Sequence, residues 1–282
     1  MKTTKKLLLT LTGFALPVIS ASLVVSCGSK ETLNEFAKDF VLGAAGRDNY
    51  NKDTKTLDLS KTNLEIIPAG AFSAQALHGL FLNTSEQANV APEFAYAPGI
   101  FNVKENKINI DKIILPGTLK VIENGAFEGL GLKEIEFDIS SSNLTKIEED
   151  AFKDNKLKTI VLPSSVTEIK ERAFYNNQIT SINLEVATNL KRLSSGVLAK
   201  NQLTNINLVN INTIDQSALA LNKFASLRLH QDLSRVSERL FWFVGEIEGV
   251  NVVALTVQNA ELKTLLKEAL TKNEKLYYTI ND

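Results

Sequence analysis

Apolar residues recur through most of this chain in one short phrase: an apolar residue, two mostly polar residues, a second apolar residue, one variable residue and a third apolar residue. Leu157-Lys-Thr-Ile160-Val-Leu162 is the clearest copy. Side chains two residues apart share one face of a strand, so each phrase predicts a short strand with one buried face. The central apolar residues follow one another at intervals of 21 to 33 residues and are Leu57, Leu80, Ile113, Ile135, Ile160, Ile182, Ile206, Leu227, Leu255 and Leu276.

A second phrase keeps step with the first: an aliphatic residue precedes a large apolar residue by five positions. Ile147 precedes Phe152 in this way, and the last copy is Leu265 with Leu270. A single short strand cannot bury its apolar face alone, so such turns must stack and share a core. We therefore expect a repeat solenoid of about ten turns. Each turn has one short parallel β-strand, with short helices or irregular coil on the opposite side.

An asparagine column runs in phase with the strand phrases, two residues before the first apolar residue of four copies. An asparagine side chain can satisfy both a donor and an acceptor in a neighbouring turn, which a buried turn needs. An exposed row that binds a ligand is the alternative, but internal hydrogen bonding at a fixed phase is the simpler interpretation. The column consists of Asn155, Asn177, Asn201 and Asn222.

The chain begins with a basic and then apolar segment that is typical of a secretory signal. Three lysines stand in the first six residues, and the stretch Leu7–Val25 leads to Cys27. This junction resembles the lipobox of bacterial lipoproteins. The resemblance implies cleavage between Ser26 and Cys27, and a diacylglycerol with fatty acids such as palmitate on the Cys27 sulfur. The alternative is an uncleaved transmembrane helix, because 19 residues nearly span a bilayer, although Pro17 and Gly13 weaken that span.

Three segments follow from these patterns. Residues 1–26 are the expected signal peptide, 27–53 a lipidated amino-terminal linker with a capping helix, and 54–282 the solenoid. The helix is predicted from apolar residues at helical spacing, among them Phe36 and Phe40. A helix that lies on the membrane is the alternative, since it would stand next to the lipid.

Composition and charge exclude several classes of function. The 282 residues carry a net charge of -1, and loss of the leader with its three lysines leaves -4. An acidic chain has no electrostatic reason to bind nucleic acid. One cysteine and two histidines are too few for a typical metal centre, and neither histidine stands in a hydrolase motif. We expect no enzymatic activity, no metal and no cofactor.

The repeat resembles the BspA-like class of leucine-rich repeats found in bacterial surface proteins. The resemblance rests on apolar-Leu-Pro at 113–116 and 160–163 followed by Ile-x-x-x-Ala-Phe, and it covers residues from about 54 to 280. With the lipobox and the Lys- and Asn-rich composition, the chain is similar to surface lipoproteins of wall-less, mycoplasma-type bacteria. This implies a surface antigen, held by lipid on the extracellular face of the cell membrane, that adheres to host cells or extracellular matrix through host proteins.

Two other functions are weighed against adhesion. A coat-like lipoprotein without a specific host ligand is the alternative. A substrate-binding lipoprotein that serves a transporter would need a two-lobed pattern, and the unbroken repeat argues against it.

The variable residue of each strand phrase points away from the core, and this column predicts a candidate binding face. Some of its residues are apolar, which is unusual on a solvated surface. The alternative is that the inserted segment 83–107 folds over Phe81 and Ile114 and covers them. The candidate binding residues are Phe81, Ile114, Val161, Asn183, Asn207 and Arg228.

Overall fold

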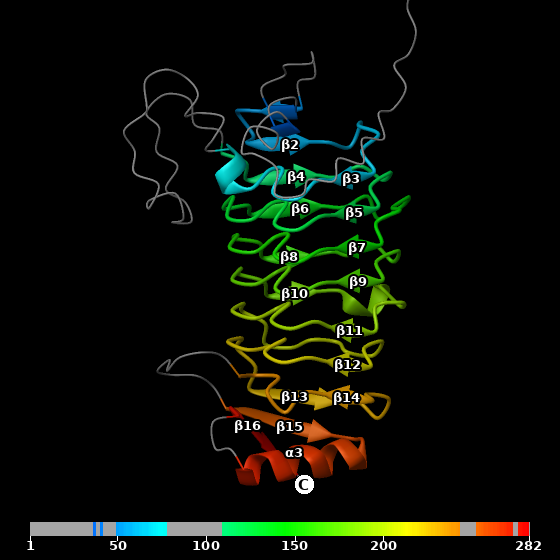
Figure 1. Cartoon of the computed structure of the whole chain (residues 1–282), viewed down its shortest axis with the longest axis vertical. Coiled ribbons are helices and arrows are strands. Elements are labelled where there is room, and N and C mark those ends of the chain that lie inside the picture. Colours follow the sequence, from blue (N-terminus) through cyan, green and yellow to red (C-terminus); the bar gives the residue numbers. More distant parts are fainter. Residues whose placement is uncertain are drawn as a thin grey trace, which may run out of the picture.

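The chain folds into a rod of stacked turns (Figure 1). Short strands from successive turns form two walls that run along the rod. The strands of one wall are called the first ladder, and those of the other wall the second ladder. Ser26, Cys27, Phe81 and the segment 83–107 lie outside the described residues. The structure, a computed structural model, describes residues 36–37, 40–41, 49–77, 109–242, 252–272 and 276–281.

The first ladder is formed by the strand phrases. Its strands run parallel with the predicted central residues in register, so that Leu57 lies opposite Ile113 and Ile113 opposite Ile135. These central side chains are buried. The predicted solenoid with short parallel strands is thereby confirmed. The strands are β2 (Thr56–Asp58), β4 (Lys112–Ile114), β6 (Glu134–Glu136), β8 (Thr159–Ile160), β10 (Ser181–Ile182), β13 (Ser226–Leu229), β15 (Val253–Val257) and β16 (Tyr278–Ile280).

Three places in this ladder differ from the ten predicted turns. β2 pairs directly with β4, so no strand lies between these two in the ladder, and the phrase around Leu80 lies outside the described residues. The phrase around Ile206 forms no strand. At the end of the chain, Ile280 instead of Leu276 lies opposite Leu255. The prediction of ten regular turns was wrong at these places, because a short apolar phrase does not distinguish a strand from a loop that buries the same side chains.

The second ladder lies where the sequence predicted short helices or coil. Each aliphatic residue of the second phrase ends a two-residue parallel strand, as the pair Ile122 and Ile147 shows. The last copy departs from this pattern, because Leu265 and Leu270 belong to helix α3 (Ala260–Lys272). The strands are β3 (Ile66–Ile67), β5 (Val121–Ile122), β7 (Lys146–Ile147), β9 (Glu168–Ile169), β11 (Arg192–Leu193), β12 (Thr213–Ile214) and β14 (Arg235–Val236).

Phenylalanine rings form a column between the two ladders. The rings of Phe72, Phe127, Phe152 and Phe174 are fully buried and stack with centroids 5.5, 5.2 and 5.4 Å apart and interplanar angles of 3°, 11° and 4°. Stacked rings at this distance attract one another beyond the burial of their area. Because each ring occupies the same place in its turn, the column holds successive turns in register. Buried leucines take this place in the next two turns.

The corner around each ring is also hydrogen-bonded from turn to turn. The Phe127 N–H donates to the Ala151 carbonyl oxygen at 2.8 Å. This corner contains a residue with left-handed backbone, such as Asp150 with φ of 57°. That conformation costs residues with a Cβ about 1 kcal/mol or more, whereas glycine adopts it freely. Glycine stands at the same place in three other turns, at Gly70, Gly125 and Gly196.

The asparagine column connects each turn to the preceding one. The Asn177 Oδ1 accepts from the Leu157 N–H at 3.1 Å, and its Nδ2 donates to the Phe152 carbonyl at 2.9 Å. A further bond from Nδ2 reaches the Phe174 carbonyl of the same turn at 3.2 Å. These bonds favour the structural interpretation of the column over a ligand-binding row. The same three kinds of bond are made by Asn155, Asn201 and Asn222.

A hairpin and aromatic rings cover the amino-terminal end of the rod. β1 (Tyr50–Asn51) pairs antiparallel with β2 and thereby covers the outer edge of β2. Phe36 and Phe40 have helical backbone, and their rings lie 5.6 and 6.2 Å from the Phe72 ring. These contacts favour a capping helix over a helix on the membrane surface.

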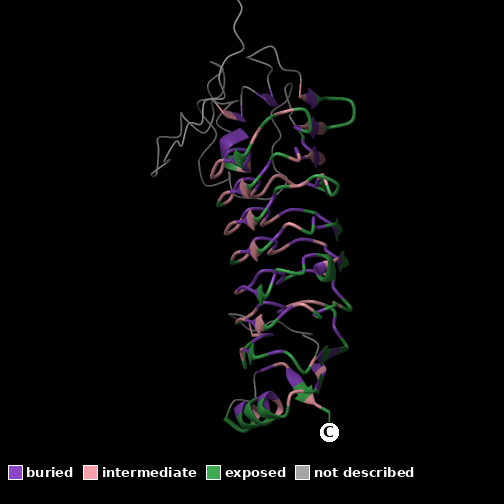
Figure 2. Cartoon of the chain, turned by 90° about the vertical axis from the view of Figure 1, so that its right-hand side faces the viewer, coloured by how far each residue is buried: buried purple, intermediate pink, exposed green. Residues whose placement is uncertain are grey.

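Helix α3 covers the carboxyl-terminal end (Figures 1 and 2). Leu262, Leu266 and Ala269 recur at helical spacing and are buried, and the helix packs on β15 and β16. Leu265, on the other side of the helix, is 50% exposed. Caps of this kind prevent the open end of a solenoid from stacking on another copy.

Replacement of Asn177 by alanine tests the asparagine column. We expect Asn177→Ala to lower the free energy of unfolding by about 2–4 kcal/mol, because the buried Leu157 N–H and Phe152 carbonyl both lose their partner. Chemical denaturation followed by circular dichroism measures this. Asn189→Ala, at an exposed position, is the control and should change stability by less than about 0.5 kcal/mol. Equal effects of the two substitutions would contradict the role of the column.

Two adjacent leucines test the carboxyl-terminal cap. Leu266→Asp places a charge in the buried contact of α3, so we expect the helix to detach and the exposed end to promote self-association. Light scattering coupled to size-exclusion chromatography should show larger species than for the unchanged chain. Leu265→Asp alters the solvent side of the same helix and should leave the mass unchanged. Identical profiles for both variants would show that α3 does not protect the end.

Candidate functional site

The outward side chains of the first ladder form one surface along the rod, here called the outer face. Asp58, Ile114 and Glu136 lie side by side on β2, β4 and β6, and Arg228 lies beside Thr256 further along. Whether the segment 83–107 covers Ile114 falls outside the described residues, as does Phe81. The predicted candidate residues among the described part of this face are Ile114, Val161, Asn183, Asn207 and Arg228, with the turn of Glu136 between the first two.

Ion pairs occupy the amino-terminal part of the outer face. The Lys112 Nζ lies 2.9 Å from a Glu134 carboxylate oxygen and 2.8 Å from one of Glu136. Hydrogen bonds to these two carboxylates raise the pKa of Lys112. Ile114, in the same strand, is half-buried. Such exposed pairs add little stability, and because one lysine faces two glutamates the group keeps a net negative charge.

Further along the face, Asn183 is engaged with the backbone of the preceding turn. Its Oδ1 accepts from the Leu162 N–H at 2.7 Å, and its Nδ2 donates to the Leu162 carbonyl at 3.1 Å. The side chain therefore takes the place of a strand partner just beyond β8 and β10. This explains its position without a ligand. Val161, one turn earlier, is 46% exposed.

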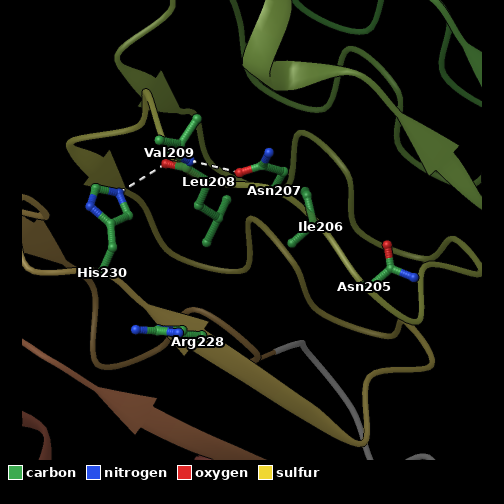
Figure 3. A pocket seen from close by; sticks show the side chains of 7 residues that line it. All are labelled: Asn205, Ile206, Asn207, Leu208, Val209, Arg228 and His230. Atoms are coloured by element: carbon green, nitrogen blue, oxygen red, sulfur yellow. Dashed lines mark hydrogen bonds between the residues drawn. The ribbon is translucent and has the colours of Figure 1, made fainter.

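The next turn interrupts the first ladder and leaves an open hollow of about 370 Å³ in the outer face (Figure 3). Residues 204–208 form no strand, so β10 and β13 belong to separate sheets. The Asn207 Oδ1 accepts from the Val209 N–H at 3.2 Å, and this local bond competes with strand pairing. The hollow brings together two predicted candidates, Asn207 and Arg228. Its lining consists of Asn205, Ile206, Asn207, Leu208, Val209, Arg228 and His230.

His230 forms one side of the hollow and is held by backbone groups. Its Nε2–H donates to the carbonyls of Leu208 at 2.9 Å and Ile211 at 3.0 Å, while Nδ1 accepts from the Asp232 N–H at 3.2 Å. These partners assign the neutral tautomer with the proton on Nε2. Both ring nitrogens are thus engaged in shaping the turn.

Two exposed valines beside the hollow were not found by sequence reasoning. Val186 is 42% exposed and Val209 is 59% exposed. Val186 ends the short 3-10 helix η2 (Leu184–Val186), and Val209 lies in the loop of the next turn. A hydrogen bond from Asn210 Nδ2 to the Glu185 carbonyl at 2.8 Å joins the two turns. Both valines follow the strand phrase instead of occupying its variable position. An extra apolar residue one or two positions after the phrase in two successive turns was the available signal.

The charge of the rod changes sign near the hollow. Residues 109–185 contain nine Lys or Arg and thirteen Asp or Glu, whereas residues 186–242 contain seven and three. In the second of these segments, the one ion pair formed by described residues joins Arg192 to Asp215 at 2.6 Å. Arg228 has no carboxylate partner in the described part of the chain.

Two further observations concern metals and membranes. Over the described ranges, Cys, His, Asp and Glu side chains form no group of three or more that could hold a metal ion. None of the helices in the same ranges combines the length and the apolar character that crossing a membrane requires.

Among solved structures, this chain is similar to the pneumococcal vaccine antigen PcpA. The two are 21% identical with a TM-score of 0.38, and the match covers 69% of this chain and 36% of the antigen. The chain therefore spans about a third of that antigen's length. No curated protein matches the sequence.

The stacked turns coincide with a match to a known repeat. The BspA type leucine rich repeat region matches residues 102–143 and 136–248 in six copies, which together take in more than half of the chain. The matched part extends from β4 to β14 and includes the hollow. On this ground, the chain belongs to the BspA-type leucine-rich repeat family.

Proposed function

We propose that this protein binds other proteins through the carboxyl-terminal half of its outer face, while a lipid on Cys27 holds it at the extracellular side of the cell membrane. The observation that carries the proposal is a set of exposed aliphatic residues in this part of the rod, Val161, Val186 and Val209, of which Val209 lines the hollow. Solenoid repeats of this family are typically non-enzymatic and present extended surfaces to protein partners. The partners that suit such a surface protein are host cell-surface or matrix proteins.

The rigidity of the rod supports this function. Binding costs less when the contact residues are already ordered, and here stacked turns hold the outer face in place. Exposed apolar side chains next to a concavity are the features around which interface hot spots form. The valines stand in the part of the face where ion pairs are scarce, so a partner can bury them without removing paired charges from water.

The anchor in this proposal is the lipidated cysteine. The mature chain would carry a net charge of -4, so electrostatic attraction to anionic lipid cannot hold it. Two acyl chains, at about 0.8 kcal/mol for each buried methylene, hold a protein stably. The lipid therefore supplies the membrane attachment, and the solenoid is free to face outward.

Paired valine substitutions test the binding face. We expect Val186→Ser with Val209→Ser to weaken saturable binding to host cells or immobilised matrix about tenfold, because both apolar contacts are lost. Ile139→Ser is the matched control, since Ile139 is 63% exposed and lies far from the hollow in sequence. Unchanged binding of the double variant would remove this face from consideration. Absence of saturable binding by the unchanged chain would favour the coat-like alternative.

Substitution of the cysteine tests the anchor. Cys27→Ser removes the sulfur that would carry the diacylglycerol, so we expect the protein to appear in the soluble fraction of the cells. Metabolic labelling with palmitate should mark the unchanged chain and not the variant. A variant that stays in the membrane with its leader intact would support the transmembrane alternative.

A further inference from the structure

Arg228 is a charged residue surrounded by uncharged residues on the outer face. From β8 to β15, the other outward residues of the strand phrases are Ser, Thr, Asn, Val or Ala. Arg228 is exposed, and its neighbour on the next strand is Thr256. A guanidinium that has no acidic partner among the described residues and stands in a hollow is well placed for an external anion.

The hollow offers hydrogen-bond donors beside this cation. The Asn207 Oδ1 is occupied by the Val209 N–H, which leaves the Nδ2 group of that side chain as a donor. Among the residues that the structure describes, no acidic side chain lines the hollow. Ile206 and Val209 add apolar surface at its border. The lining therefore suits a carboxylate that is flanked by aliphatic groups.

The surrounding charge favours the same ligand. Residues 186–242 carry four more basic than acidic side chains, and this excess attracts and orients an acidic partner. From these observations we infer that the hollow binds an acidic segment of a protein partner, with a carboxylate on the Arg228 guanidinium and aliphatic neighbours against Val209 and Val186. The inference rests on the proposed function and specifies the chemistry of its partner.

A second copy of this chain fits the hollow less well. Part of the opposite charge that it would contribute lies in residues 109–185, which carry four more acidic than basic side chains. On the outer face of that segment, Glu134 and Glu136 are already paired with Lys112. Docking of a second copy would break these pairs, whereas an independent acidic segment brings carboxylates without such a cost.

A peptide-binding measurement tests the inference. The probe is a fluorescent peptide in which glutamate alternates with valine, and its comparison is the same peptide with glutamine for glutamate. Anisotropy with the full-length chain in mild detergent should show at least tenfold tighter binding of the glutamate peptide. Arg228→Gln should remove this preference, and Arg228→Lys should retain part of it, because lysine keeps the charge but not the two-pronged geometry. Arg235→Gln, an exposed arginine of the second ladder, is the matched control and should keep the full preference.

Three results would overturn the inference: equal affinity for both peptides, full preference in Arg228→Gln, or an equal loss in the Arg235→Gln control. Self-association of the unchanged chain that disappears in Arg228→Gln would assign the hollow to a second copy and likewise overturn it. Failure here is distinguishable from failure of the proposed function. If the valine pair is needed for host binding but the peptides do not differ, only the acidic partner is wrong. If the peptides differ but the valine pair is dispensable, the hollow binds carboxylates and the proposed host-binding face is wrong.

Discussion

Each turn of this rod depends on its neighbours for hydrogen-bond partners. A turn of about 22 residues crosses the core in two short strands, and its buried N–H and carbonyl groups cannot all be paired within the turn. Three sets of bonds solve this problem: the two ladders, the corner at each phenylalanine, and the asparagine column. All three connect equivalent positions of successive turns, so they are available only while the period is kept. The regular spacing of the apolar phrases is thus a consequence of polar pairing as much as of apolar packing.

The same dependence explains how one turn can lose its strand. At residues 204–208 the first ladder is interrupted, but the turn is still held where it enters the ladder. The Leu203 N–H is bound by the Asn222 Oδ1 at 3.0 Å, and Asn201 secures the preceding turn through the Ile179 N–H at 2.9 Å. Because side chains fix this turn on both sides, the solenoid tolerates a local Asn207 bond in place of strand pairing. The hollow is therefore an interruption that the asparagine column stabilises.

Sequence reasoning was accurate where a pattern repeats many times and less accurate where a single copy had to be judged. The buried phenylalanines and the Asn177 bonds follow from phase, because several copies support each assignment. The second ladder was not distinguished from coil, since a two-residue strand has no periodicity of its own. Leu265 and Leu270 match the second phrase in spacing, yet Leu262, Leu266 and Ala269 form the stronger helical pattern. On the candidate face, Arg228 and Asn207 were identified, but the hollow that joins them depends on a missing strand, which only the pairing of neighbouring turns reveals.

The arrangement of charge along the rod affects whether the proposed site would lie against the membrane or away from it. In the proposed arrangement, with a lipid anchor at Cys27, the amino-terminal end of the solenoid would stand nearest the membrane, and the acidic residues 109–185 would follow it. Five strand spacings of about 4.8 Å separate β2 from the interrupted turn, which places the hollow about 24 Å further along the rod. Anionic lipid repels the acidic half, and the intervening distance exceeds the screening length of about 8 Å at physiological salt. In the proposed arrangement the basic residues 186–242 would therefore not be drawn onto the lipid surface, and Arg228 would stay clear of it.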